Sequence, residues 1–142
     1  MSKEGKMITI LLADDDPDDR QLTRDAFAQN RLANELHCVE DGEELLDYLH
    51  RRGRYENLNG KPLPGLILLD LNMPRKNGAE VMIEIRSEPA LHNIPIVVLT
   101  TSNEEDVPIV IREMADGFIT KPATFDEWIA IIKSLAEQWL VK

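Results

Sequence analysis

The sequence predicts an α/β fold in which a doubly wound parallel sheet carries helices on both faces. Short runs rich in Ile, Val and Leu are typical of strands that are buried on both faces. Between these runs, apolar residues recur at the spacing of an amphipathic helix. The order strand then helix occurs five times, and this alternation implies right-handed crossovers between parallel strands. In such folds the ligand site lies outside the carboxyl ends of the strands.

The predicted strands are five short segments, most of them dominated by aliphatic side chains. Continuous aliphatic runs are expected in a parallel sheet because neither of its faces meets water. The segments are residues 7–13, 35–39, 66–69, 94–99 and 117–119.

Helices are predicted where apolar residues lie three or four positions apart. Asp16 is expected to cap the first helix and Pro17 to begin it, since these residue types favour those positions. Pro108 disfavours helix before it, so the fourth helix should begin near Val107, with Asp106 as its cap, and reach barely two turns. The helical spacing elsewhere is carried by Leu22 and Ala26; Leu45 and Leu49; Val81, Met82 and Ile85; and Trp128, Ile132, Leu135 and Trp139.

One long connection separates the second helix from the third strand. The stretch HRRGRYENLNGKPLPG, residues 50–65, contains Gly, Pro and Asn residues that argue against regular structure over most of its length. A loop of this length is either functional or mobile. Its Arg51, Arg52 and Arg54 are expected to complement the dipole of the preceding helix and to keep the surface soluble.

Length and composition fit one folded domain over residues 1–142, with no output domain attached. Hydrophobic residues make up 43% of the chain and charged residues 30%, as in ordinary globular proteins. The formal net charge of -10 would repel phosphate backbones and anionic lipid, which argues against nucleic acid and membrane partners. Cys38 is the only cysteine, so an internal disulfide is excluded, and no targeting segment is found. We therefore expect a cytoplasmic protein.

Acidic residues stand where two of the predicted strands end. Asp14 and Asp15 follow the first strand, and Asp70 follows the third. These strands are neighbours in a doubly wound sheet, so the three carboxylates should converge in one pocket. Two like charges ~4 Å apart repel by roughly 4 kcal/mol at an effective dielectric constant of 20. A cation is therefore expected among them, and the oxygen ligands suit Mg²⁺, although solvated strand-end acids are the simpler alternative.

Two further polar residues border the same predicted pocket. Thr100 follows the run IPIVVL at the end of the fourth strand, and Lys121 follows the fifth strand. Taken singly, a strand-end Thr is usually a β-branched filler and a Lys before Pro122 is usually solvated. Together with the acids they supply a carboxylate nucleophile, a cation, a hydroxyl donor and an ammonium. These are the groups needed to accept a phosphoryl group on Asp70.

Four motifs resemble, in their order, those of response-regulator receiver domains of two-component signalling. They are LLADDDPDD, LILLDLNMPRKNG, IPIVVLTTS and GFITKP, and they are spread over nearly the whole chain. The resemblance implies a flavodoxin-like fold, a five-stranded parallel sheet flanked by five helices. It also implies that a histidine kinase donates a phosphoryl group to Asp70.

The resemblance further implies roles for individual residues of the pocket. Asp15, Asp70 and the backbone carbonyl of Asn72 would hold Mg²⁺, and Asp14 would act largely through water. The hydroxyl of Thr100 and the ammonium that follows the fifth strand would each contact a phosphoryl oxygen after transfer. Phe118 occupies the position of the aromatic switch of these domains, and plain core packing is its alternative role.

The expected partners are a kinase and a second copy of the chain. The long connection and the ending EQWL resemble single-domain regulators that partner bacterial phytochromes, which would make a phytochrome the kinase. Ile109, Val110 and Ile111 are consecutive, so at least one of them should face outward. Ile129 and Ile131 add apolar residues to the last helix. We therefore expect a homodimer through the face formed by the fourth helix, fifth strand and fifth helix.

Two rival functions use the same residues. A Mg²⁺-dependent phosphohydrolase with Asp70 as its nucleophile would need a second acid two residues further on, where this chain carries Asn72. A receiver-like scaffold that is never phosphorylated need not keep Asp15, Thr100 and Lys121 together with the nucleophile. The histidines show no metal-ligand spacing and are expected to be solvated or locally bonded; they are His37, His50 and His92.

Overall fold

The computed structural model describes residues 8–101 and 107–140. Its strands are β1 (Ile10–Ala13), β2 (Leu36–Val39), β3 (Leu66–Asp70), β4 (Ile96–Thr100) and β5 (Gly117–Thr120). They pair in parallel in the order β2-β1-β3-β4-β5, which makes β1 and β3 neighbours and leaves β2 and β5 at the edges. The predicted five-stranded parallel sheet is therefore confirmed.

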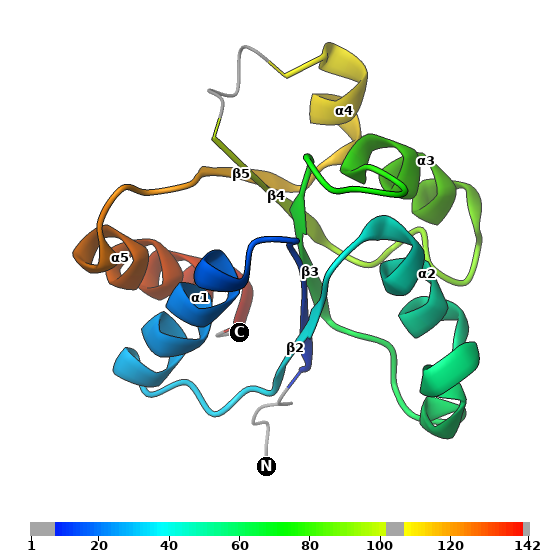
Figure 1. Ribbon diagram of the computed structural model, residues 1–142, viewed down its shortest axis with the longest axis horizontal. Helices are drawn as coiled ribbons and strands as arrows, with labels where there is room; N and C mark the ends of the chain where they lie inside the picture. Colours follow the sequence, from blue (N-terminus) through cyan, green and yellow to red (C-terminus); the bar gives the residue numbers. More distant parts are fainter. Residues whose placement is uncertain (1–7, 102–106, 141–142) are drawn as a thin grey trace.

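Helices cover both faces of this sheet, as a doubly wound fold requires (Figure 1). The α-helices of the described residues are α1 (Pro17–Gln29), α2 (Gly42–His50), α3 (Gly78–Ser87), α4 (Ile109–Met114) and α5 (Phe125–Leu135). On one face α1 packs against α5, and on the other α3 lies between α2 and α4. Of these helices, none combines the length and the apolar character needed to cross a membrane.

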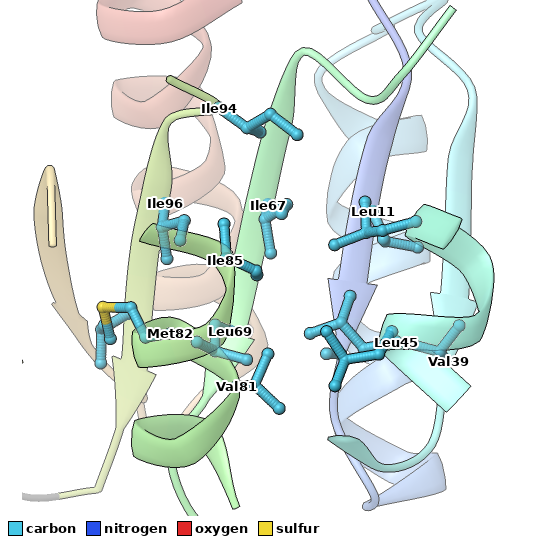
Figure 2. Close-up of a cluster of buried hydrophobic side chains, with 14 of the residues drawn as sticks. Leu11, Val39, Leu45, Ile67, Leu69, Val81, Met82, Ile85, Ile94 and Ile96 are labelled. Atoms are coloured by element: carbon cyan, nitrogen blue, oxygen red, sulfur yellow. The ribbon is translucent and has the colours of Figure 1, made fainter. Parts of the chain in front are cut away.

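Alternate side chains of the central strands enter two separate hydrophobic cores. Leu11 and Ile67 belong to the core under α2, α3 and α4, whereas Leu12 and Leu68 belong to the core under α1 and α5. Figure 2 shows part of the first core, where side chains of α2 and α3 meet those of the strands. Trp128 of α5 is 2% exposed in the second. Both faces exclude water, which explains the unbroken aliphatic runs in the sequence.

Polar residues satisfy the free N–H groups at the helix starts. Oδ1 of Asp16 accepts a hydrogen bond from the N–H of Asp18 at 2.9 Å, and Pro17 begins α1, as predicted. At α5, Thr124 and Glu127 form a capping box, in which each side chain accepts a hydrogen bond from the other residue's N–H. These caps fix where the chain turns from β1 into α1 and from β5 into α5.

Several element ends differ from the predicted segments. β1 begins at Ile10 rather than at residue 7, and Met7 lies outside the described residues. β4 begins at Ile96 because the N–H of Ile94 closes a turn onto the carbonyl of Leu91. The last helix of regular α type ends at Leu135, and Trp139 lies in the following π-helical turn, η3 (Ala136–Leu140).

The fourth helix is short, as predicted, but it begins later than predicted. α4 starts at Ile109 with Pro108 as its cap residue, because proline has no N–H and holds the preceding backbone extended. The predicted cap, Asp106, lies outside the described residues. Ile109 and Val110 are 63% and 55% exposed, whereas Ile111 is 4% exposed in the core. The prediction that at least one of these residues faces outward is confirmed.

The long connection contains one regular segment, the 3-10 helix η1 (Gly53–Leu58). The residues on either side of η1, 51–52 and 59–65, have no regular structure, as predicted for most of the connection. Arg52 and Arg54 are exposed, and they pair with Asp47 at 3.2 Å and with Glu44 at 2.8 Å. For these two arginines the predicted surface role fits the structure.

Arg51 does not have the surface position predicted for it. Its side chain is buried and donates hydrogen bonds to the carbonyl oxygens of Lys61 and Pro62. The prediction failed because these acceptors belong to the far end of the connection, whose path is not readable from local sequence. Arg51 therefore ties the two ends of the connection together.

The histidines behave as predicted. Nδ1 of His37 lies 2.7 Å from the hydroxyl of Tyr48, and Nε2 of His50 lies 2.8 Å from a carboxylate oxygen of Glu88. His92 is exposed. Each contact is local packing between neighbouring elements.

Two glycines allow the segment after β3 to pack closely against the helices around it. A Cβ at Gly78 would lie 2.7 Å from the carbonyl oxygen of Asp70, and a Cβ at Gly42 would clash with the carbonyl oxygen of Lys76. The N–H of Gly78 donates to the carbonyl of Leu71 at 3.0 Å. The start of α3 is thereby held against the carboxyl end of β3.

Gly78→Ala should destabilise the protein by about 2 kcal/mol, because the added methyl group overlaps backbone that cannot move independently of β3. Gly117→Ala is the matched control, since its Cβ would meet only ordinary contacts at 3.5 Å or more. Urea denaturation of both variants measures the difference. Equal stabilities of the two variants would contradict the close approach at Gly78.

Candidate functional site

Three carboxylates meet at the carboxyl edge of the two central strands. One oxygen each of Asp14, Asp15 and Asp70 lies within 4.8 Å of the others, so the predicted convergence is confirmed. Asp14 is fully buried and Asp70 is 4% exposed, whereas Asp15 is exposed. The cluster is therefore open to solvent on the side of Asp15.

Backbone N–H groups orient the two buried carboxylates in the same way. Oδ1 of Asp14 accepts a hydrogen bond from the N–H of Asp16 at 2.9 Å, and Oδ1 of Asp70 accepts one from the N–H of Asn72 at 3.0 Å. Asp residues at turns commonly bond the backbone two residues ahead in this manner. In each carboxylate, Oδ2 is the oxygen that turns toward Lys121.

The ammonium of Lys121 bridges the acids. Its Nζ lies 3.0 Å from Oδ2 of Asp14, 3.2 Å from Oδ2 of Asp70 and 2.8 Å from Oδ2 of Asp19. Lys121 lies at the predicted edge of the sheet, whereas Asp19, in the first turn of α1, is a contact that was not predicted. Its position three residues after the predicted cap, Asp16, was the available signal, because it sets the first turn beside the end of β1.

Burial and charge shift two pKa values at this site. Burial raises the pKa of Asp14 to about 6, against the lowering effects of the Asp16 N–H and of Lys121. Burial alone would lower the pKa of Lys121, but contacts with Asp19, Asp14 and Asp70 raise it above its ordinary value. Lys121 is therefore held as a cation, whereas burial disfavours the negative charge of Asp14.

The cluster has the donor set of a hard divalent cation. Oδ2 of Asp14 is buried and, apart from Lys121, has no partner among the described residues. Asp15 is exposed at the rim, so its carboxylate can turn to a ligand at low cost. Four carboxylates around one ammonium leave excess negative charge, and oxygen ligands of this type suit Mg²⁺.

The remaining predicted residues lie on β4, on β5 and directly after β3. Thr100 ends β4 and is 3% exposed, and its carbonyl accepts a hydrogen bond from the N–H of Lys121 at 2.7 Å. Phe118 is half-buried against the core under α3 and α4, and it pairs in register with Val98, which precedes Thr100 on the same face. Asn72 is exposed beside Asp70.

A carboxylate, an ammonium and a hydroxyl-bearing residue thus stand together around a potential cation site. This arrangement can hold a phosphoryl group, with the carboxylate of Asp70 as nucleophile and the cations balancing its charge. Asp70 is itself 4% exposed, and the exposed member of the cluster is Asp15.

Comparison with known proteins gives a consistent result. The sequence pattern of the response regulator receiver domain matches residues 10–133. Response regulator Rcp1 of Synechocystis sp. is 37% identical over 132 residues, which cover 92% of this chain and 88% of that protein. The probable methanogenesis regulatory protein FilR2 of Methanothrix harundinacea is 32% identical over 132 residues, covering 92% of this chain and 83% of that protein.

Solved structures show the same likeness. The phosphorylated cyanobacterial phytochrome response regulator RcpA superposes with a TM-score of 0.84 at 38% identity, covering 95% of each chain. The Mn²⁺-bound form of response regulator Rcp1 superposes with a TM-score of 0.81 at 38% identity, covering 94% of each chain.

Asp14→Asn should increase stability near neutral pH, without divalent cations, by about 1 to 3 kcal/mol. The carboxyl of Asp14 has a pKa of about 6 in the folded protein, against an ordinary value of 3.8. Its ionisation therefore lowers the free energy of unfolding as the pH rises through this interval. The gain should shrink as the pH is lowered from about 6 and should vanish below about 3, where the carboxyl is protonated in both the folded and the unfolded state. Urea denaturation in EDTA measures it.

Asp25→Asn is the control, because Asp25 is an exposed acid of α1 outside the cluster. It should leave stability nearly unchanged at every pH. A gain for Asp14→Asn that does not depend on pH would mean that the charge of Asp14 is not its cause.

Proposed function

Because the chain belongs to the family of response regulator receiver domains, we propose that Asp70 accepts a phosphoryl group from a histidine kinase in a Mg²⁺-dependent reaction. The observation that carries this proposal is the convergence of Asp14, Asp15 and Asp70 around Lys121 at the carboxyl edge of the sheet. Phosphorylation would then change the binding of a partner protein.

The transfer step uses the carboxylate of Asp70. One of its oxygens attacks the phosphorus of a phosphohistidine, the new O–P bond forms, and the N–P bond to the imidazole breaks. The imidazole of the kinase leaves with the electron pair and takes up a proton. Lys121 keeps its positive charge throughout, because the surrounding carboxylates raise its pKa, and it would pair with a phosphoryl oxygen.

Asp15, Asp70 and the backbone carbonyl of Asn72 would hold the metal ion directly, with Asp14 acting largely through water. When bound, Mg²⁺ would supply positive charge that neutralises the phosphoryl oxygens during transfer. The solvent-open position of Asp15 and the buried Oδ2 of Asp14 support this division of roles. The excess of carboxylates over ammonium groups supports the need for the ion.

The phosphorylated state would be read through Thr100 and Phe118. Both residues lie on the sheet face that α3 and α4 cover, and Phe118 is half-buried there. A hydroxyl of Thr100 drawn toward a phosphoryl group would vacate space beside Phe118. The surface of α4 and β5 would then change shape.

The relatives support a phytochrome as the kinase. RcpA is a cyanobacterial phytochrome response regulator, and the likeness to RcpA and to Rcp1 extends over nearly all of each chain. The net charge of -10 argues against nucleic acid or lipid as a partner. Turnover of external substrates is not expected, since Asn72 cannot protonate a leaving group as a second acid would.

Incubated with Mg²⁺ and acetyl phosphate, the protein should gain one base-labile phosphoryl group, and Asp70→Asn should abolish it because the nucleophile is removed. Intact-mass spectrometry measures the gain, and EDTA should prevent it. Asp19→Asn is the control, since it removes an acid of the same cluster that is not the nucleophile. Undiminished labelling of the Asp70→Asn variant would place the phosphorylation site elsewhere.

We also propose that the chain forms a homodimer through α4, β5 and α5. Ile109 and Val110 are more than half exposed, and a groove of about 410 Å³ between β5 and α5 is lined in part by Phe118, Ile131 and Trp139. Burying one such aliphatic side chain contributes roughly 1.5 to 3 kcal/mol. A two-fold arrangement would cover the same patch on both copies.

Ile109→Asp should shift the protein from dimer to monomer in sedimentation at micromolar concentration, because it places a charge in the proposed interface. Ile83→Asp is the matched control, since Ile83 is an isoleucine of α3 that is 51% exposed outside this face. A wild-type monomer both with and without phosphorylation would disprove the interface, as would equal dissociation of the two variants.

A further inference from the structure

A second cavity lies at the opposite edge of the sheet from Asp70. It has a volume of about 670 Å³ and lies between the amino ends of β1 and β2, the end of α2 and the connection that follows α2. In Figure 1 this connection runs down from α2, away from the carboxyl ends of the strands. Cavities of this volume accommodate small organic molecules. Nothing in the proposed phosphoryl chemistry uses it.

Arg51 brings a buried positive charge to this cavity. The residue is 9% exposed, and its guanidinium donates to the carbonyl oxygens of Tyr48, Lys61 and Pro62 at 2.9, 3.2 and 2.9 Å. It also lies 5.2 Å from the centroid of the Tyr48 ring. Carbonyl oxygens solvate the guanidinium but do not neutralise it. Among the described residues no carboxylate forms an ion pair with Arg51, although buried charges are normally paired.

The neighbouring arginines, unlike Arg51, do form ion pairs. Arg52 pairs with Asp47 and Arg54 pairs with Glu44, as expected in a chain with excess acid. The acidic residue of the cavity lining is Glu35, and one of its carboxylate oxygens lies 3.0 Å from Nε2 of His37.

The backbone at Arg51 is left-handed, as it also is at Arg31 and Arg75. Arg51 caps α2 in the left-handed conformation, with φ of 57°, a position where glycine is most common. The left-handed conformation is less favourable for a non-glycine residue than for glycine. Arginine thus occupies a position where backbone preference favours glycine, and what it adds is a guanidinium at the cavity wall.

The rest of the cavity lining supplies apolar surface and a second positive charge. Ile8, Leu58 and Leu63 are apolar, and Leu63 is 37% exposed although it is a large hydrophobic residue. Lys61 is exposed and adds a second positive charge. We propose that this cavity binds a small organic carboxylate, whose charged group pairs with Arg51 and Lys61 and whose apolar body contacts the aliphatic side chains.

Phenylpropionate and its neutral analogue phenylpropanol test the proposal on the full chain. Titration followed by amide NMR shifts should show saturable binding of phenylpropionate, with the shifts concentrated at the cavity residues Thr9, His37 and Leu63. Phenylpropanol should bind at least about tenfold more weakly, because it lacks the charge. Equal binding of the two compounds, shifts concentrated elsewhere, or no saturable binding would overturn the proposal.

Variants test which positive charge of the cavity lining the binding of phenylpropionate requires. Arg51→Gln should weaken phenylpropionate binding at least about tenfold, and Lys61→Gln should weaken it less, because Lys61 is exposed. Arg52→Gln is the matched control and should leave binding unchanged, since Arg52 is not part of the lining. If Arg51→Gln fails to fold, Lys61→Gln decides: binding as strong as that of the wild type would overturn the assigned charge pairing.

Discussion

The candidate site depends on the contact of one ammonium, that of Lys121, with carboxylates from three different parts of the chain. Asp14 follows β1, Asp70 ends β3 and Asp19 lies in α1, and each is held within 3.2 Å of the same Nζ. Without this cation the buried carboxylates would repel one another across the carboxyl edge of the sheet. The same contact leaves the site short of positive charge, which is the condition for binding a further cation.

The parallel sheet explains why that contact is built where it is. All strands run in one direction, so their carboxyl ends, with the polar residues that follow them, gather at a single edge. Two buried cores hold the strands from both sides and leave little freedom to β1 and β3. The close approach of Gly78 to Asp70 then limits the path of the segment after β3. A rigid sheet thus presents acids whose spacing is set by backbone hydrogen bonds.

The buried cations at the two edges of the sheet have different partners. At the carboxyl edge the ammonium of Lys121 meets carboxylates, whereas at the amino edge the guanidinium of Arg51 meets backbone carbonyls. Carbonyl dipoles can hold a guanidinium in place, and its planar group of donors suits several acceptors at once. They leave its charge unbalanced, so the long connection is both a structural tie and a wall of a polar cavity. The connection thus joins α2 to β3 and also packs around Arg51.

The residues alone predict the alternation of strands and helices, the strand-end acids and the ammonium that follows β5. These features are local, because aliphatic runs and caps act over a few neighbouring residues. Three features emerge only from the packing of the folded chain: Asp19 joins the cluster, Ile111 is buried while Ile109 faces outward, and Arg51 turns inward. Each depends on the rotation of a helix or the path of a loop relative to the sheet. Packing of distant segments sets those relations, and no short stretch of sequence contains them.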